Sequence, residues 1–399
     1  ALLASCERLW RNIVDRKLYI TGGIGATHMG EAFSFDYDLP NDTAYSESCA
    51  AIALAFFARR MLEIQPKSEY ADVMESALYN TTLAGMALDG KSFFYVNPLE
   101  VVPEACHRDE RKAHVKPVRQ KWFGCACCPP NIARIVEDVQ QYAYTIGDDS
   151  STLYVHLYMG GGVHARLSGT DVRLDVMSDM PWSGKGSVAV GFDAGDSASD
   201  ASKDAVFTIA LRLPAWAGGE TASDAVTVRG CDISRVIRDG YLYLTGAWHD
   251  GDVVDFDFPM PVHMVAANPL VREDAGKVAF VRGPLAYCAE GVDNGANLHL
   301  LHADTARIAS DPSCVSVDRI VFHAAAAQDE QGLGEVDAVD MPMTTLTIPA
   351  WREVEDAAQT SALYHDWRPA ERKTTTATLI PYFAWANRGE NEMTVFLRG

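Results

Sequence analysis

Residues 152–158 are Thr-Leu-Tyr-Val-His-Leu-Tyr, and the spacing of apolar residues along the chain changes at this stretch. Before it, apolar residues recur three or four positions apart, as they do on one face of a helix. After it, short runs alternate between apolar and polar residues, as they do in strands with one buried face. The sequence therefore predicts a multidomain chain that is helical first and built from strands afterwards.

The helical part is expected to contain four helices, of which the second is apolar almost all round. Ala50–Phe57 is a nearly continuous apolar run, which is typical of a buried helix. We expect Thr43 to cap this helix, Gly90 to end the next one and Pro129-Pro130 to open the last. Four such helices cannot close a core by themselves, so we expect them to be the end of a larger helical array. The expected helices span residues 2–17, 43–62, 68–88 and 131–144.

The second part is expected to form two β-sandwiches, because short apolar strands follow one another with turn signals between them. The proline-rich segment Phe258-Pro-Met-Pro261 marks the boundary between two sets of strands. We therefore expect three domains, at residues 1–147, 148–260 and 261–399. The expected strands lie at residues 152–158, 172–176, 187–191, 206–213 and 240–244 in the first set, and at residues 278–281, 316–322, 344–348, 376–381 and 393–397 in the second.

The chain of 399 residues carries a formal net charge of −20, from 34 basic and 54 acidic side chains. This excess of negative charge opposes binding to nucleic acid or to an anionic lipid surface. The sequence also has no window of about 18 uninterrupted apolar residues that could span a membrane. We therefore expect neither nucleic acid nor a membrane as a partner. Part of the acidity lies in Asp193–Asp200, which we expect to be a solvated loop.

The nine cysteines are scattered along the chain apart from one tight group, which does not indicate a disulfide framework. They are typical of a reducing compartment, so we expect a cytoplasmic protein. Ala1-Leu-Leu-Ala lacks the basic start of a signal peptide. Because the chain does not begin with Met, we expect it to be the C-terminal part of a longer polypeptide.

The strongest chemical signal is the segment Trp122–Pro130, Trp-Phe-Gly-Cys-Ala-Cys-Cys-Pro-Pro. Its three thiols lie directly before an expected helix start, where backbone N–H groups and the helix dipole favour thiolates. Crowded thiolates are commonly stabilised by a soft metal ion, most often zinc. The segment is therefore a candidate for a zinc site or a reactive cysteine.

Zinc usually takes four ligands, and a second segment could supply two of them. Residues 45–50, Tyr-Ser-Glu-Ser-Cys-Ala, place a carboxylate and a thiol two residues apart. The candidate ligands are Glu47, Cys49, Cys127 and Cys128. One carboxylate with three thiolates would be unusual for a purely structural site, which normally uses cysteine and histidine. Two plainer interpretations stay open at this point: a structural zinc knuckle, and a buried Cys49 beside a capping Glu47.

Four sequence blocks occur in a specific order and spacing. They are Tyr19-Ile-Thr-Gly-Gly-Ile-Gly, Gly30-Glu-Ala-Phe with Tyr37-Asp-Leu-Pro-Asn-Asp, Tyr45-Ser-Glu-Ser-Cys-Ala, and Trp122-Phe-Gly-Cys-Ala-Cys-Cys-Pro. Together they resemble the bacterial β-L-arabinofuranosidase family, glycoside hydrolase family 127, and the resemblance extends through essentially the whole chain. It implies a partial (α/α)6 barrel, with roughly its first half missing, followed by two β-sandwich domains.

The resemblance also implies roles for individual residues. Cys127 is implied to be the nucleophile of a retaining glycoside hydrolase, and Glu31, in Gly-Glu-Ala-Phe, its general acid/base. Tyr95, in the aromatic run 93–97, is similar to a family tyrosine that contacts the sugar, although aromatic runs are also typical of a core. The implied zinc ligands are Glu47, Cys49, Cys127 and Cys128. Several sugar-contacting histidines of the family would lie before residue 1, and the family suggests a homodimer.

The activity that the resemblance implies is release of β-L-arabinofuranose from arabino-oligosaccharides or glycoprotein glycans, with Zn²⁺ as cofactor. Zinc would hold the Cys127 thiolate and accept it back as a leaving group. Glu31 would first donate a proton to the departing oxygen and then activate water. Two rival interpretations remain: a family member with another sugar specificity, and a carbohydrate-binding protein whose zinc is structural.

Other polar groups near Glu31 have competing interpretations. Asp36 and Asp38 could form an inverting carboxylate pair with Glu31, but closely spaced aspartates are also typical of turns. His28, three residues before Glu31, is a candidate sugar contact. The Gly-rich segment Thr21–Ala26 lacks the Lys-Ser/Thr of a P-loop, so we expect it to let the backbone approach a sugar closely.

Overall fold

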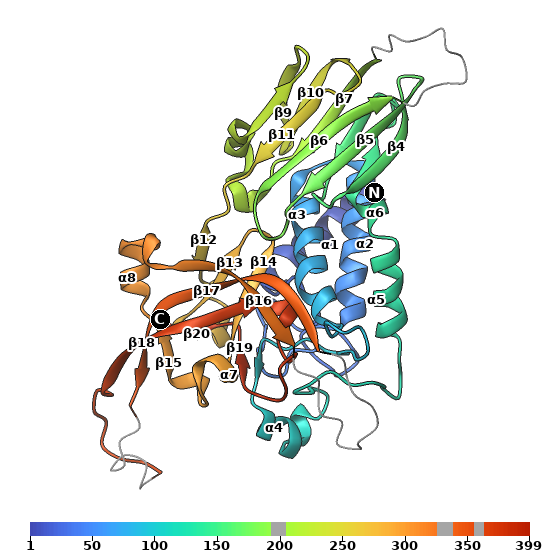
Figure 1. Cartoon of the computed structure of the whole chain (residues 1–399). Coiled ribbons are helices and arrows are strands. Elements are labelled where there is room, and N and C mark those ends of the chain that lie inside the picture. Colours follow the sequence, from blue (N-terminus) through green and yellow to red (C-terminus); the bar gives the residue numbers. More distant parts are fainter. Residues whose placement is uncertain (193–204, 325–337, 355–362) are drawn as a thin grey trace.

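The computed structural model of the chain describes residues 1–192, 205–324, 338–354 and 363–399. Figure 1 shows three regions: helices near the centre, a β-sandwich above them, and a third region of strands to the lower left. The order of helices followed by strands agrees with the sequence prediction. The acidic segment Asp193–Asp200, predicted to be a solvated loop, lies outside the described residues.

The first region packs helices around a core of aromatic and aliphatic side chains. Its helices are α1 (Leu2–Arg16), α2 (Ser48–Ile64), α3 (Ser68–Ser76), α4 (Pro103–Arg108), α5 (Cys128–Glu137) and α6 (Gln140–Ala143). Trp10 of α1 is buried against Tyr70 of α3, with ring centroids 4.9 Å apart, and against Phe57 of α2 at 5.4 Å. Ile13 and Val14 of α1 are partly buried against the same core, whereas Leu9 of the predicted apolar pattern is exposed.

The second helix begins at Ser48, and the predicted cap at Thr43 is wrong. The residues before Ser48 are held by other segments instead. The Ser46 N–H donates to the Gly25 carbonyl at 2.8 Å, and Glu47 forms an isolated β-bridge with Val96. These tertiary hydrogen bonds keep the chain out of the helix up to Glu47, so the Glu47 carboxylate lies at the helix start.

The third helix does not continue to Leu88 as predicted. It passes into a π-helical turn, η1 (Ala77–Thr82). Asn80, in this turn, donates through its side-chain amide to the Pro284 carbonyl at 2.9 Å and accepts from the Ala286 N–H at 2.8 Å. The wider turn thus serves contacts with the third region, which the spacing of apolar residues cannot reveal.

The last predicted helix begins earlier and is interrupted. α5 starts at Cys128, so Pro129 and Pro130 lie in its first turn, where proline costs no intrahelical hydrogen bond. It ends at Glu137, and the short α6 follows separately. Cys127 takes the N-cap position, so two thiols lie at a helix start as predicted.

The second region is a β-sandwich of two five-stranded sheets. One sheet contains, in order, β2 (Tyr144–Ile146), β3 (Thr152–Val155), β7 (Ala205–Arg212), β10 (Tyr241–Trp248) and β9 (Ser234–Arg238). The other contains, in order, β4 (Gly161–Leu167), β5 (Thr170–Ser178), β6 (Lys185–Phe192), β11 (Val253–Asp257) and β8 (Val226–Arg229). Alternate residues of β5 (Val172, Leu174 and Val176) are buried in the core with Trp248, as the period of two predicts.

In the third region, the strands join one hydrogen-bonded network of ten strands instead of the two separate sheets of the predicted second sandwich. β17 is 15 residues long and pairs with three neighbours, β15, β16 and β18, so it links strands that would otherwise belong to different sheets. The strands are β1 (Glu100–Val101), β12 (Val262–Val265), β13 (Lys277–Arg282), β14 (Leu285–Glu290), β15 (Leu301–Ala303), β16 (Ser316–Ala324), β17 (Val339–Glu353), β18 (Arg372–Pro381), β19 (Met393–Thr394) and β20 (Leu397–Arg398). Two short helices, α7 (Gly291–Asn294) and α8 (Thr305–Ser310), lie between them.

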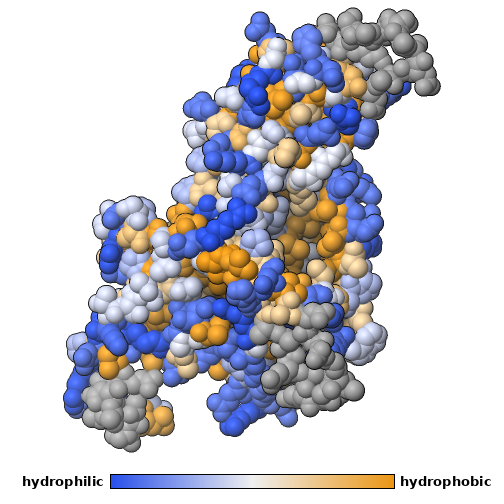
Figure 2. All heavy atoms as spheres, in the orientation of Figure 1, coloured by the Kyte–Doolittle hydropathy of each residue, from blue (hydrophilic) through white to orange (hydrophobic). Residues whose placement is uncertain are grey.

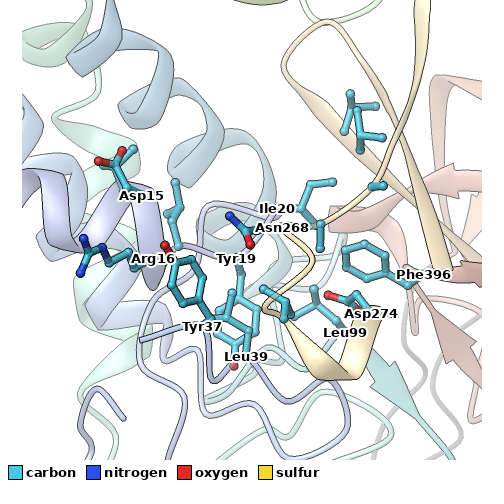
Figure 3. A pocket seen from close by; sticks show the side chains of 17 residues that line it. Asp15, Arg16, Tyr19, Ile20, Tyr37, Leu39, Leu99, Asn268, Asp274 and Phe396 are labelled. Atoms are coloured by element: carbon cyan, nitrogen blue, oxygen red, sulfur yellow. The ribbon is translucent and has the colours of Figure 1, made fainter. Parts of the chain in front are cut away.

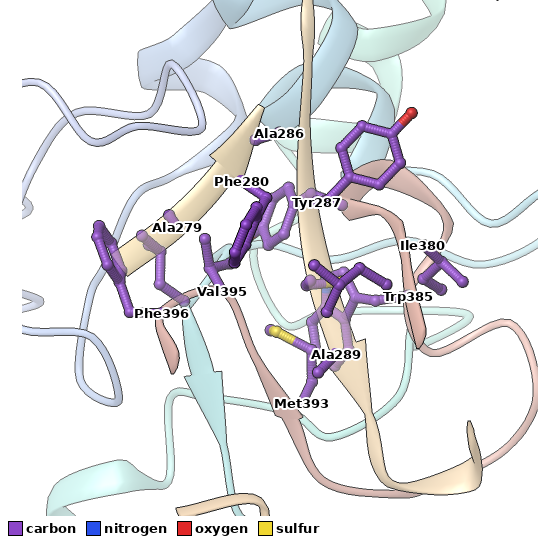
Figure 4. Packing of buried hydrophobic residues seen from close by; sticks show 14 of the residues in the cluster. Ala279, Phe280, Ala286, Tyr287, Ala289, Ile380, Trp385, Met393, Val395 and Phe396 are labelled. Carbon is purple, nitrogen blue, oxygen red and sulfur yellow. The ribbon is translucent and has the colours of Figure 1, made fainter. Parts of the chain in front are cut away.

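The third region and the first share one core. β1 comes from the first region but pairs with β19 of the third. The buried Arg119 guanidinium donates to the carbonyls of Trp385 at 2.6 Å and Phe383 at 3.1 Å. Figure 4 shows Phe280, Tyr287, Trp385 and Met393 within this core, whose members also include residues of the first region such as Phe94. The segment of residues 94–120 therefore packs against both the first and the third region.

Apolar side chains also lie on the surface of the first region. Figure 2 shows hydrophobic residues gathered on the visible face over the helices. The exposed apolar side chains on its helices include Leu2 and Leu9 of α1, Ile64 of α2 and Val136 of α5. In the described part of the chain, no helix combines the length and apolar composition that crossing a bilayer requires.

Candidate active site

The four predicted metal ligands lie together. One ligand atom each of Glu47, Cys49, Cys127 and Cys128 falls within 4.8 Å of the others. The Cys49 and Cys128 sulfurs are 3.5 Å apart, and the Cys127 sulfur lies 3.5 Å from Glu47 Oε1. Glu47 and Cys49 come from the start of α2, and the other two from the start of α5. Two helix starts, both of which favour negative charge, thus meet at one site.

The start of α2 is tied to the segment that carries Tyr95. The Ser48 N–H donates to the Tyr95 carbonyl at 3.0 Å. The Asn97 side-chain amide donates to the Ser48 hydroxyl at 3.0 Å and to the Ser46 carbonyl at 2.9 Å. Ser48 and Asn97 are fully buried, so these hydrogen bonds are shielded from water. They fix the position of Tyr95 relative to Glu47.

The Tyr95 hydroxyl lies between the two predicted catalytic groups. It is 3.2 Å from the Cys127 sulfur and donates to Glu31 Oε1 at 3.4 Å. The Tyr45 hydroxyl donates to the same carboxylate oxygen at 2.7 Å. Burial raises the pKa of both tyrosines, which keeps their hydroxyls protonated as donors. The structure therefore brings Glu31, Tyr95 and Cys127 into one chain of polar contacts.

Glu31 occupies a tight turn and contacts Tyr95, which in turn contacts Cys127. Its backbone φ is 50°, in the left-handed region that few side chains adopt without other constraints. Its N–H donates to the His28 carbonyl at 3.3 Å, and Thr27 and Ala32 are bridged across the turn. Glu31 is exposed to solvent.

The electrostatics of the thiols favour a bound cation. The hydrogen bond between the Cys49 and Cys128 thiols lowers the pKa of Cys49 to about 7. The same hydrogen bond, together with burial, raises the pKa of Cys128. Burial raises the pKa of Cys127 to about 11. The cluster thus accepts one negative charge readily and resists further ones. Three sulfur ligands and one carboxylate oxygen suit a soft divalent metal ion, which would offset this repulsion.

Two histidine side chains stack on each other next to the turn that carries Glu31. The rings of His28 and His114 are stacked with centroids 4.4 Å apart, and the Tyr45 ring lies 6.3 Å from His114. Burial lowers the pKa of His114, so this ring is neutral near pH 7. Sequence reasoning did not single out His114 or Tyr45. Only the place of Tyr45 within the block 45–50 could have indicated its role.

The two other carboxylates near Glu31 are engaged elsewhere. Asp36 pairs with Arg16 at 2.7 Å and Lys17 at 3.0 Å, and Asp38 accepts from the Ser34 hydroxyl. These contacts tie the loop to α1 and to itself. They favour the turn interpretation of these aspartates and do not support an inverting pair with Glu31.

The Gly-rich segment is tightly packed against protein. A Cβ atom on Gly22 would lie 2.5 Å from the Ala77 backbone nitrogen, and one on Gly23 would lie 2.0 Å from the Ser46 hydroxyl. Only glycine fits such close approaches. At these two positions the backbone closely approaches η1 and Ser46, so the packing of the protein itself accounts for the glycines. The predicted approach to a sugar stays a prediction. Cys125, the remaining thiol of the Trp122–Pro130 segment, is exposed and lies outside the cluster of four ligands.

A pocket of about 400 Å³ lies between α1 and the third region, away from these groups. Figure 3 shows Tyr19, Tyr37, Leu39, Leu99 and Phe396 among its lining side chains. Its lining is mainly apolar, and Asp274 in it accepts a hydrogen bond from the buried Asn41 at 2.7 Å. It shares no residue with the thiol cluster, so we assign it no part in the chemistry.

Comparison with known proteins links these regions to one family. Residues 1–141 match the family model described as the β-L-arabinofuranosidase GH127 catalytic domain. Residues 152–260 match the GH127 middle domain, and residues 262–398 match the glycoside hydrolase family 127 C-terminal domain. Three models of one family thus match in order from residue 1 to residue 398.

Individual relatives agree with these matches. The chain is 39% identical over 397 residues to the non-reducing end β-L-arabinofuranosidase of Bifidobacterium longum subsp. longum, covering 100% of this chain and 56% of that protein. A GH127 β-L-arabinofuranosidase structure from Geobacillus stearothermophilus T6 superposes with a TM-score of 0.81 at 42% identity, covering 99% of this chain and 56% of that one. A further GH127 β-arabinofuranosidase structure gives a TM-score of 0.77 at 32% identity, with coverage of 99% and 56%.

The chain thus spans little more than half the length of these relatives, and it corresponds to their C-terminal part. Within that part, the helical region, the sandwich and the third region each match a consecutive domain of the same family. The chain therefore belongs to glycoside hydrolase family 127.

Proposed function

We propose that this chain carries the nucleophile and the acid/base of a retaining β-L-arabinofuranosidase, which releases β-L-arabinofuranose from arabino-oligosaccharides or glycoprotein glycans. The observation that carries the proposal is the position of the Tyr95 hydroxyl, 3.2 Å from the Cys127 sulfur and 3.4 Å from Glu31 Oε1. The names of the relatives supply the sugar.

The spacing of the two groups is compatible with a retaining reaction. Retaining glycosidases hold nucleophile and acid/base about 5–5.5 Å apart, whereas inverting enzymes leave a wider gap for water. Here the sulfur and the carboxylate oxygen each contact the same hydroxyl, so at most two hydrogen-bond lengths separate them. A sugar carbon and its leaving oxygen would fit between such groups in place of the hydroxyl contact.

The reaction would proceed in two displacements. Cys127 Sγ attacks the anomeric carbon as the glycosidic C–O bond breaks, and Glu31 gives its proton to the departing oxygen. Glu31, now a carboxylate, then removes a proton from water as the water oxygen attacks the same carbon. The S–C bond breaks with its electron pair returning to sulfur, which restores the starting state with retained configuration.

A zinc ion would be held by Glu47, Cys49, Cys127 and Cys128, whose ligand atoms lie within 4.8 Å of one another. When bound, it would lower the proton affinity of the Cys127 sulfur and make that sulfur a better leaving group. The hydroxyls of Tyr45 and Tyr95 both donate to Glu31 Oε1, so they would orient the carboxyl group for both proton transfers.

The domain organisation follows the same proposal. Residues 1–147 would be the C-terminal part of an (α/α)6-barrel catalytic domain, and residues 148–260 a β-sandwich. Residues 261–399 would form the last domain. The family matches at residues 1–141, 152–260 and 262–398 support these divisions.

The direct test is hydrolysis of an aryl β-L-arabinofuranoside by the wild-type chain and by Glu31→Gln. The chain is prepared as it stands and also with any residues that its natural gene encodes before Ala1. We expect the variant to lose at least about 100-fold in kcat for a substrate with a poor leaving group, while its fold is retained. Glu69→Gln, at a half-buried glutamate paired with Arg11, is the matched control. Equal activity of wild type and Glu31→Gln would contradict the proposal.

A further inference from the structure

A second group of metal-ligating side chains lies in the sandwich. Ligand atoms of Cys231, His249 and Asp252 fall within 4.8 Å of one another. None of the three belongs to the proposed catalytic site, which is built from the starts of α2 and α5. The group combines a thiol, an imidazole and a carboxylate, which are the three side-chain types that zinc takes as ligands.

The three residues lie where the chain twice crosses between the two sheets of the sandwich. Cys231 follows β8 of one sheet and precedes β9 of the other. His249 and Asp252 lie between β10 and β11, which belong to the same two sheets in the opposite order. A ligand shared by the three side chains would therefore join both crossovers at one place.

The Asp252 carboxylate is buried although it lies in the connection between β10 and β11. The residue is only 5% exposed. Among the described residues its ion-pair partner is His249, with no Lys or Arg beside it. Its Oδ2 accepts from the His249 N–H at 2.8 Å and lies 3.3 Å from His249 Nδ1. These hydrogen bonds already stabilise the charged carboxylate, and a bound cation would add the positive charge that no Lys or Arg of the described residues supplies there.

The backbone before Cys231 is adapted to this contact. Gly230 has a φ of +119°, and a Cβ atom there would lie 1.8 Å from Asp252 Oδ1. A larger residue would push the carboxylate away from the β8–β9 crossover. The glycine thus allows Cys231 and Asp252 to lie side by side.

We propose that Cys231, His249 and Asp252 bind a soft divalent cation such as zinc, which clamps the two sheet crossovers. Two ligand atoms about 2.0–2.1 Å from a tetrahedral zinc ion lie about 3.3 Å apart. The observed distance from His249 Nδ1 to Asp252 Oδ2 is 3.3 Å, so these two atoms need little movement. A water molecule would complete the coordination, since the His249 side chain is half exposed.

The test follows Cys231 itself, so that metal at the other thiol site does not interfere. The intact chain is stripped with a chelator, incubated with or without zinc, and alkylated for increasing times. Mass spectrometry of proteolytic peptides then gives the alkylation rate of each cysteine. We expect zinc to slow alkylation of Cys231 and to leave that of Cys314 unchanged, because Cys314 belongs to no such group of ligands among the described residues.

His249→Ala is the deciding variant. It should abolish zinc protection of Cys231 without unfolding the sandwich, since the side chain is half exposed. His323→Ala is the matched control, because His323 also pairs with a carboxylate, Asp340 at 2.7 Å, but belongs to no group of three or more possible metal ligands among the described residues. Equal alkylation of Cys231 with and without zinc, or protection that survives in His249→Ala, would overturn the proposal.

Discussion

The Tyr95 hydroxyl lies 3.2 Å from the Cys127 sulfur, and buried hydrogen bonds between the Tyr95 segment and the start of α2 hold it there. This contact joins two segments that are 32 residues apart in the chain. Because the same hydroxyl donates to Glu31, it couples the proposed nucleophile to the proposed acid/base.

Removing the hydroxyl should weaken catalysis more than folding. We expect Tyr95→Phe to lower kcat by roughly 10- to 100-fold, about 1.4–2.8 kcal/mol of barrier, because Glu31 and Cys127 lose a shared polar contact. Steady-state kinetics with an aryl β-L-arabinofuranoside measure the change. Tyr142→Phe, whose ring stacks on Phe56, is the matched control and should be neutral. An unchanged kcat in Tyr95→Phe would mean that the contact has no catalytic role.

The two neighbouring cysteines of the Trp122–Pro130 segment should behave differently. Cys127→Ser should reduce turnover by at least about 1,000-fold, because a hydroxyl is a far poorer nucleophile and metal ligand than a thiolate. Cys125→Ser should keep activity, since Cys125 is exposed and outside the four-ligand cluster. Metal content measured on both variants separates loss of the nucleophile from loss of the site. Full turnover by a folded Cys127→Ser would remove the thiolate mechanism.

His156 should make the sandwich sensitive to acid. It is fully buried between the Tyr241 and Thr145 hydroxyls, each 2.7 Å from a ring nitrogen. Burial, with the nearby charges of Arg59 and Arg212, lowers its pKa to about 3, whereas the unfolded chain has a value of about 6.5. The unfolded state therefore takes up the proton first, and the free energy of unfolding falls as the pH drops from about 6.5 towards 3.

His156→Gln tests this assignment. The variant should be less stable near pH 7, because the two hydroxyls lose good partners, but its stability should depend less on pH below about 6.5. Urea unfolding of both proteins at about pH 7 and about pH 4.5 gives the comparison. Parallel loss of stability in wild type and variant would assign the acid sensitivity to other groups.

The π-helical turn should be needed for docking of the third region. Asn80→Ala leaves the Ala286 N–H and the Pro284 carbonyl without their partner, at a cost of about 2–4 kcal/mol in the free energy of unfolding. Urea unfolding measures the loss. Asn268→Ala, which removes an exposed amide with one local hydrogen bond to Leu270, should change stability by less than about 0.5 kcal/mol. A loss of similar size in both variants would contradict the role of Asn80.

Local sequence signals predicted the two pairs of metal ligands, but not the position of Tyr95 between Cys127 and Glu31. The prolines after Cys128 place two thiols at a helix start, and the spacing of Glu47 and Cys49 offers two further ligands. The position of Tyr95 depends on the hydrogen bonds of Asn97 to Ser46 and Ser48, for which the sequence has no periodic signal. The same tertiary ties explain why the predicted cap at Thr43 is wrong.

The order of helices and strands was predictable because each type of element has its own spacing of apolar residues. Strand pairing was not, since it depends on contacts between distant segments. β1 pairs with β19, and the predicted strand at residues 393–397 is interrupted into β19 and β20, which pair with different neighbours. Short apolar runs of this kind carry no information about their partners.

The most direct measurement is mass spectrometry of the Glu31→Ala variant after incubation with an aryl β-L-arabinofuranoside that has a good leaving group. Such a substrate needs little acid assistance, whereas the second displacement lacks its base, so the covalent species should accumulate. We predict one added anhydropentose on the peptide that contains Cys127, and none in the Glu31→Ala, Cys127→Ser double variant. Release of the aryl alcohol with no adduct, or with the sugar on a carboxylate, would contradict the account.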